Sequence, residues 1–139
     1  AYDVVRVGVG EPFLAHLLAR HAEDVAQFNP PPEELLAQAE HAFLVTSGDE
    51  VVGVVLSRAG DADGEQQVVL DYVLPPYRDF TPGEFVFRAD GPFAEMGARR
   101  VVASPAMTAS ERYLAAVGFV PDDAGRRVLH LAGAARPEG

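Results

Sequence analysis

The sequence predicts a single α/β domain whose sheet is partly antiparallel and partly parallel. At 139 residues and 48% hydrophobic content, the chain has enough apolar material for one core and is too short for a second independent domain. Its periodicities follow the order strand, two helices, three strands, helix, strand, helix, strand. Hairpin-joined strands are antiparallel, whereas late helical crossovers favour parallel neighbours. We therefore expect one domain over residues 1–139, with a frayed tail at 132–139.

The first forty residues predict a strand followed by two helices. We expect the opening strand at Asp3 to Val7, because it is short and rich in valine. Apolar residues recur at helical spacing from Phe13 to Phe28, and the prolines at 30–32 end that helix. A second helix then begins at Pro31 or Pro32, since proline is favoured in the first turn of a helix.

The middle of the chain has the pattern of three strands. Phe43 to Thr46 and Val51 to Ser57 are β-rich runs joined by a hairpin turn. A polar loop over 58–64 is expected to be exposed. Gln67 to Leu74 is the strongest strand, and Pro75-Pro76 ends its pairing because proline has no N–H to donate.

The last third alternates helices and strands. A helix is expected over Gly83 to Met96, shortened or broken at Gly91-Pro92. Arg100 to Ala103 is a brief buried strand, and a helix capped by Thr108 ends at Gly118. The final strand is expected at Arg127 to Leu131.

Composition excludes several classes of site. Cysteine is absent, so disulfides, thiolate metal sites and a cysteine nucleophile are ruled out. The four histidines have no metal-ligand spacing, and we expect no metal. Ser104 and Ser110 lack the G-x-S-x-G setting of a nucleophilic serine.

Charge and hydropathy indicate the compartment and the partners. The formal net charge is −10, and the eleven basic residues are scattered arginines, which argues against nucleic acid as a partner. No stretch approaches the roughly 20 apolar residues of a membrane span, and the N-terminus lacks a signal-peptide pattern. We expect a cytoplasmic protein without membrane contact. An acidic exterior suits a cationic acceptor such as an amine, although it equally serves solubility alone.

The segment from Leu70 to Phe85 is the most informative for function. A strand that ends at prolines, followed by a tight loop and a helix, presents backbone N–H groups that bind anions such as a pyrophosphate. This segment resembles the fourth strand and coenzyme-binding loop of the GCN5-related N-acetyltransferases (GNAT), which read V-x-P-x-Y-R and R-x-x-G-x-G. The residues in register are Val73, Pro75, Tyr77, Arg78 and Gly83.

A second motif and the element order extend the resemblance over nearly the whole chain. Tyr113 to Phe119 is similar to the family's closing aromatic and its helix ending in Gly-Phe. The resemblance implies a three-layer domain: a central mixed, mostly antiparallel sheet, splayed at strands four and five, with helices on both faces. It implies acetyl-coenzyme A (acetyl-CoA) as co-substrate and no metal. The cofactor-binding residues it implies are Val73, Leu74, Arg78, Phe80, Thr81, Gly83 and Glu84.

The resemblance also implies a pair of catalytic residues. In the family the acceptor amine attacks the thioester directly, a carboxylate on strand four removes its proton, and a tyrosine on the last helix protonates the departing thiolate. Asp71 is the strand-four carboxylate here. Counting back from Gly118-Phe119 places the tyrosine position on Leu114, so Tyr113 is offset by one residue, or about 100° of helix.

The expected function is therefore transfer of an acetyl group from acetyl-CoA to a small amine or to an exposed peptide amino group. A second hypothesis stays open because Thr81 and Pro82 depart from the family's loop pattern. It is a GNAT-like module that does not catalyse and serves as a sensory or interaction domain. A second copy of the chain or a longer protein is a further candidate partner.

Overall fold

The computed structural model describes residues 2–27, 29–80, 86–88, 90–104 and 111–131. Its strands are β1 Asp3–Val7, β2 His41–Ser47, β3 Glu50–Ala59, β4 Glu65–Val73, β5 Arg100–Val102, β6 Val120–Pro121 and β7 Arg127–His130. Its helices are α1 Pro12–Arg20, α2 Ala22–Val25, α3 Pro32–Gln38, α4 Pro92–Glu95 and α5 Glu111–Val117, with a 3₁₀ helix η1 at Pro75–Phe80. No helix in these ranges is long and apolar enough to cross a membrane.

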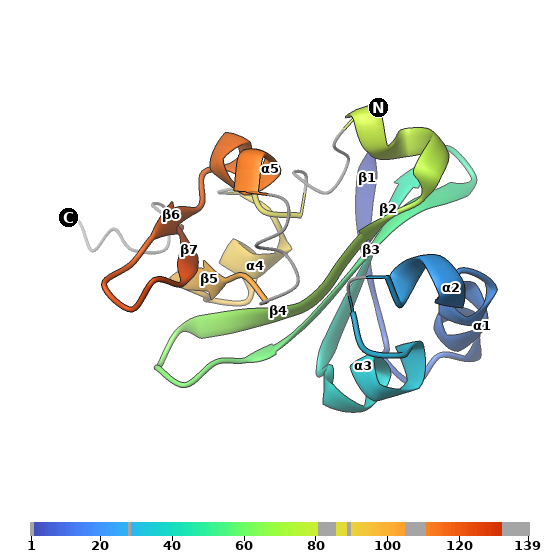
Figure 1. The fold of residues 1–139 in the computed structure, drawn as a ribbon, viewed down its shortest axis with the longest axis horizontal. Coiled ribbons are helices and arrows are strands. Elements are labelled where there is room, and N and C mark those ends of the chain that lie inside the picture. Colours follow the sequence, from blue (N-terminus) through green and yellow to red (C-terminus); the bar gives the residue numbers. More distant parts are fainter. Residues whose placement is uncertain (1, 28, 81–85, 89, 105–110, 132–139) are drawn as a thin grey trace.

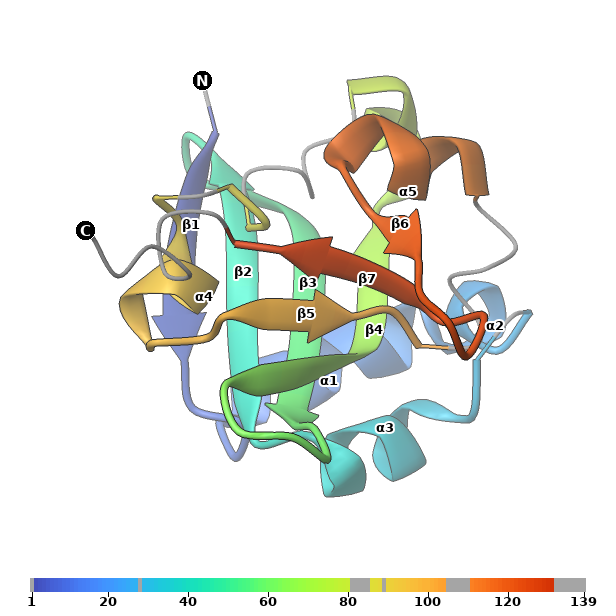
Figure 2. The same cartoon turned by 90° about the vertical axis from the view of Figure 1, so that its left-hand side faces the viewer.

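Within the described ranges, seven strands form one sheet in the order β1-β2-β3-β4-β5-β7-β6 (Figures 1 and 2). Neighbouring strands are antiparallel except β4 and β5, which run parallel. The predicted sheet, mixed and mostly antiparallel, is confirmed, and the strand expected at Gln67 to Leu74 is its central strand.

Helices cover both faces of the sheet, as predicted (Figure 1). One face packs against α1, α2 and α3 through a core that we call the α1–α3 core. Its buried residues are Leu14, Leu17, Leu18, Val25, Leu35, Ala42, Leu44, Val54, Leu56, Val69, Leu70 and Tyr72. The other face packs against α4 and α5 in the α4/α5 core, whose largest members include Phe43, Phe87, Phe93, Leu114 and Phe119.

Two of the predicted helices are wrong in extent. The helix expected over Phe13 to Phe28 is divided into α1 and α2 at His21, whose φ of −111° and ψ of 21° leave the helical region. Among the described residues, the helix expected over Gly83 to Met96 is present only as α4, and residues 86–88 form a turn and bends instead. Gly91 before Pro92 is extended, at φ −88° and ψ −170°, because the proline ring disfavours helical backbone in the preceding residue.

The parallel β4–β5 ladder is short. It pairs Glu65–Gln67 with Arg100–Val102, and β4 continues for six more residues to Val73. Val69, between the two paired segments of β4, is the extra residue of a bulge against β3. Beyond Gln67 and Val102, no further pairing of β4 with β5 is found among the described residues, in agreement with the expected splay. We call this unpaired region the gap between β4 and β5.

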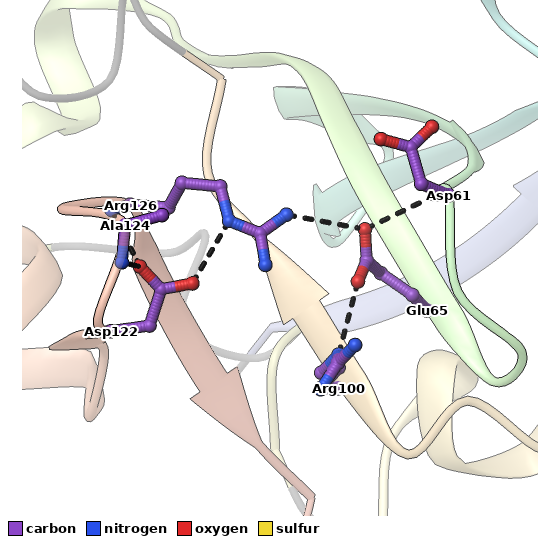
Figure 3. A network of polar contacts seen from close by, with 6 residues as sticks. All are labelled: Asp61, Glu65, Arg100, Asp122, Ala124 and Arg126. Carbon is purple, nitrogen blue, oxygen red and sulfur yellow. Dashed lines mark hydrogen bonds and ion pairs between the residues drawn. The ribbon is translucent and has the colours of Figure 1, made fainter.

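A buried carboxylate holds the closed end of this ladder (Figure 3). The side chain of Glu65 is 4% exposed and accepts a hydrogen bond from Arg100 Nε at 3.0 Å. Its other oxygen lies 3.6 Å from Arg126 Nη1 and accepts a hydrogen bond from the backbone N–H of Asp61 at 3.3 Å. Arg126 is held in turn by Asp122 at 2.9 Å. One carboxylate thus connects the β3–β4 turn to β5 and to the β6–β7 turn.

We predict that Glu65→Gln lowers the free energy of unfolding by about 1 to 2 kcal/mol, because hydrogen bonds to a charged acceptor become neutral ones. Urea unfolding at pH 7 measures the difference. Asp63→Asn, which neutralises an exposed acid in the same turn, is the matched control and should change little. Equal stabilities of the two variants would contradict a structural role for this network.

Candidate active site

The two predicted catalytic residues meet in the structure. The hydroxyl of Tyr113, on α5, donates a hydrogen bond to Asp71 Oδ2, on β4, at 3.0 Å, across 42 positions of sequence. Asp71 faces α5 because its neighbours Leu70 and Tyr72 belong to the α1–α3 core on the opposite face. The pair lies beyond the open end of the β4–β5 ladder.

The C-terminus of α5 decides which residue reaches the sheet. Gly118 has φ +120°, and the N–H of Phe119 donates to the carbonyl of Leu114 at 2.9 Å, which is the Schellman arrangement. Leu114 and Phe119 are then both buried in the α4/α5 core. Leu114 is fully buried, so Tyr113 and not Leu114 presents its side chain to Asp71.

The environment of Asp71 suits a proton acceptor. Burial raises the pKa of its carboxyl from 3.8 to about 6, while the hydrogen bond from Tyr113 acts in the opposite direction. Its Oδ1 atom is buried and has no hydrogen-bond partner among the described residues. A general base works best when its pKa lies near the working pH. At neutral pH the group is therefore ionised, and a buried oxygen remains available to a ligand.

The segment after β4 begins with a 3₁₀ helix, where the motif predicted a tight loop. Val73 still pairs with Gly53 of β3, and the N–H of Leu74 donates to the carbonyl of Val52 at 2.9 Å. Pro75 and Pro76 then begin η1, whose short 3₁₀ turns suit residues with fixed φ and no N–H.

The predicted cofactor-binding residues are only partly placed by the structure. Val73 and Leu74 lie at the end of β4, and Arg78 and Phe80 belong to the backbone of η1. Thr81, Gly83 and Glu84 lie outside the described residues, as does the predicted cap Thr108. Their roles toward the coenzyme stay predictions.

Sequence reasoning missed a polar cluster on the other face of β4. Tyr72 is 6% exposed, and its hydroxyl donates to Asp24 Oδ2 on α2 at 2.7 Å. The ring of His21 lies 5.7 Å from that of Tyr72. No local motif links these three residues. The chain breaks between α1 and α2 at His21, where no glycine or proline would have predicted a break, and this break brings α2 to β4.

Sequence reasoning also set Ser104 aside for lack of a nucleophile motif. In the structure its side chain is 6% exposed, and its Oγ is buried without a hydrogen-bond partner in the described part of the chain. The described residues hold no group of three or more side chains placed to bind a metal ion.

No protein-family profile and no curated protein matches the sequence. Solved structures do match the fold. The ribosomal-protein-S18-alanine N-acetyltransferase of Escherichia coli superposes with a TM-score of 0.68 at 12% identity, over 100% of this chain and 99% of its own. An acetyltransferase of the GNAT family from Staphylococcus aureus Mu50 gives 0.65 at 13% identity, over 94% and 99%.

A third structure has a small-molecule ligand. An aminoglycoside acetyltransferase from an uncultured soil metagenomic sample, solved in complex with sisomicin, gives a TM-score of 0.62 at 14% identity, over 84% of this chain and 87% of its own. All three pairs superpose over most of both chains. The resemblance to GNAT proteins is thereby confirmed at the level of the fold.

Proposed function

Because the chain has the fold of GNAT acetyltransferases, we propose that it is an acetyl-CoA-dependent N-acyltransferase that acts on a small amine or an exposed amino group by direct transfer. The observation that carries this proposal is the hydrogen-bonded pair of Asp71 and Tyr113 at the open end of the β4–β5 ladder. Two structural neighbours support an amino acceptor, since their names specify a protein alanine and aminoglycosides. A non-catalytic module would have no need of a buried carboxylate with one unused oxygen.

The residues present fit the co-substrate. From Val68 to Asp71, β4 has no described partner strand on its β5 side, so this edge can receive an extended arm as another strand would be received. Val73 and Leu74 would hold that arm, and Arg78 with the loop from Phe80 to Glu84 would hold the phosphates. Bound there, acetyl-CoA supplies an acetyl group activated as a thioester.

The pair is arranged to move one proton. Asp71 accepts a proton from the acceptor nitrogen, which frees the lone pair for attack. The protonated carboxyl then donates its hydrogen bond to the Tyr113 oxygen, 3.0 Å away, and the tyrosine O–H turns toward the departing sulfur. The proton lost by the ammonium thus ends on the thiol. After attack the nitrogen loses a second proton to the regenerated carboxylate, which passes it to water, so no other acid is needed.

Two measurements test the function. Calorimetric titration with acetyl-CoA should show binding, and thiol release should require both acetyl-CoA and an amine. The protein contains no cysteine, so a thiol-reactive chromophore reports the released coenzyme without background from the chain. A panel of peptides with free N-termini, aliphatic amines and aminoglycosides provides the acceptors. Absence of binding at millimolar acetyl-CoA would favour the non-catalytic alternative.

We predict that Gly83→Glu abolishes coenzyme binding, because a carboxylate in the loop repels the phosphates and fills their space. Gly10→Glu is the matched control: it adds the same side chain and charge where a Cβ would meet nothing within 4 Å. Calorimetry on both variants, with circular dichroism to verify folding, gives the comparison. Equal affinities for acetyl-CoA would place the phosphates elsewhere.

We predict that Tyr113→Phe raises the pKa of Asp71 above its present value of about 6, because the lost hydrogen bond is the interaction that lowers it. The acidic limb of the kcat profile should therefore move to higher pH. The rate at pH 7 should fall roughly 10-fold, less than for removal of the carboxylate. Tyr77→Phe, which removes a hydroxyl bonded to Glu50, is the control and should leave the profile in place. An unmoved acidic limb in Tyr113→Phe would dissociate the tyrosine from the base.

A further inference from the structure

The hydroxyl of Ser104 is buried without a hydrogen-bond partner among the described residues, whereas the other buried serine there, Ser57, has one. Ser57 is fully buried, and its Oγ donates to Gln66 Oε1 at 3.1 Å. Ser104 is buried almost as completely, yet its Oγ contacts no donor or acceptor in the described residues. An unpaired buried hydroxyl is unfavourable, and alanine would fill the same place without that cost. The hydroxyl therefore indicates a partner other than the described residues of the chain.

The position of Ser104 identifies the gap where that partner would lie. The β4–β5 ladder ends at Gln67 and Val102, and Ser104 follows two residues later. Asp71 is four residues past the ladder on the facing strand, with one residue taken up by the bulge. Asp71 and Ser104 are therefore offset by only about one residue, roughly 3.3 Å, along the strand direction. The two oxygens that lack partners, Oδ1 of Asp71 and Oγ of Ser104, thus belong to the two chains that border one gap.

The two side chains approach this gap from different faces of the sheet. Asp71 faces α5, whereas Ala103 belongs to the α4/α5 core, so the alternation of an extended chain puts Ser104 on the opposite face. A group contacted by both must lie between the strands. It must also donate hydrogen bonds in at least two directions, because a carboxylate only accepts and a hydroxyl has free lone pairs.

We propose that Ser104 binds the nitrogen of a primary-amine acceptor, accepting one of its N–H hydrogens while Asp71 Oδ1 accepts another, directly or through one water. This assignment rests on the proposed function and specifies its acceptor class. A primary amine keeps two N–H donors when its lone pair is free, which matches the two oxygens. A secondary amine has one such donor and leaves one oxygen unpaired, so the site discriminates against it.

Kinetics with a matched pair of acceptors test the proposal. The probes are a peptide with N-terminal alanine and the same peptide with N-terminal N-methylalanine, at saturating acetyl-CoA. Ser104→Ala should raise the KM for the alanyl peptide about 5- to 30-fold and leave the KM for acetyl-CoA unchanged. The preference for the primary over the secondary amine should shrink by a similar factor. Ser104→Thr, which keeps the hydroxyl, should retain the preference.

Thermal stability, measured as the Tm, provides a second test that does not depend on catalytic turnover. Ser104→Ala should leave the Tm of the free protein unchanged or raise it, whereas Ser57→Ala, which breaks a hydrogen bond, should lower it. A drop in Tm for Ser104→Ala as large as that for Ser57→Ala would show a partner within the chain and overturn the proposal.

The kinetic outcomes separate this proposal from the function on which it rests. An unchanged preference between the two peptides in Ser104→Ala, in a protein whose turnover still depends on Asp71, would refute the role of Ser104 alone. Absence of acetyl transfer by the unmodified protein to every amine tested would refute the proposed function and this assignment with it.

Discussion

Asp71→Asn should slow acetyl transfer about 10²- to 10⁴-fold at pH 7 when acetyl-CoA is saturating. At neutral pH most of an aliphatic amine is protonated, and it must lose a proton before its nitrogen can attack. Asparagine has nearly the shape of aspartate but cannot accept that proton. The variant should regain rate as the pH rises, because the free amine then becomes abundant without the help of a base.

Single-turnover rates with acetyl-CoA saturating separate this effect from binding. Asp63→Asn, an exposed carboxylate in the β3–β4 turn, controls for the change of net charge. The loss should also exceed that of Tyr113→Phe, since water can protonate a thiolate leaving group whose reference pKa is about 8.5. A larger loss in Tyr113→Phe would make the tyrosine the main contributor as general acid. Full activity of both variants would remove catalysis from this gap.

The sequence identified Asp71 and Tyr113 as candidates, but it did not show whether position 113 or position 114 of the last helix faces Asp71. Asp71 could be predicted because Pro75-Pro76 mark the end of its strand and fix its place on it. Tyr113 and Leu114 could not be separated, since one residue turns a helix by about 100° and only the packing of α5 selects the side that faces the core. The structure resolves this through Leu114, which the Schellman turn at Gly118 brings against Phe119.

The features that sequence reasoning missed depend on contacts between distant segments. Glu65 meets Arg100 across 35 positions, and no local pattern distinguishes Glu65 from the exposed acids around it. The interruption before α4, by contrast, has a local cause. The sequence predicts it, because Gly91-Pro92 disfavours a continuous helix. Ser104 is informative only through a missing partner, which can be recognised once burial is known.

The same carboxylate should make the free protein less stable as the pH rises. The pKa of Asp71 is about 6 in the folded protein and near 3.8 when the chain is unfolded. Below pH 3.8 both states hold the proton and the group contributes no difference. Between the two values the unfolded state releases its proton first, so stability falls as the pH rises, and above pH 6 the full difference is present. At about 1.4 kcal/mol per pH unit, the interval corresponds to about 3 kcal/mol.

Asp71→Asn should therefore unfold later than the unmodified protein at pH 7 to 8, by up to about 3 kcal/mol, and the advantage should vanish near pH 4. The variant that loses the most activity would thus be the more stable protein, because the buried charge that serves the amine has no other partner than Tyr113 among the described residues. Urea titrations of both proteins from pH 4 to 8, without ligand, give the two curves. Parallel curves over that range would show that the carboxyl of Asp71 titrates normally in the folded state. Burial would then not destabilise its charged form, and Asp71 would lack the raised pKa expected of a general base.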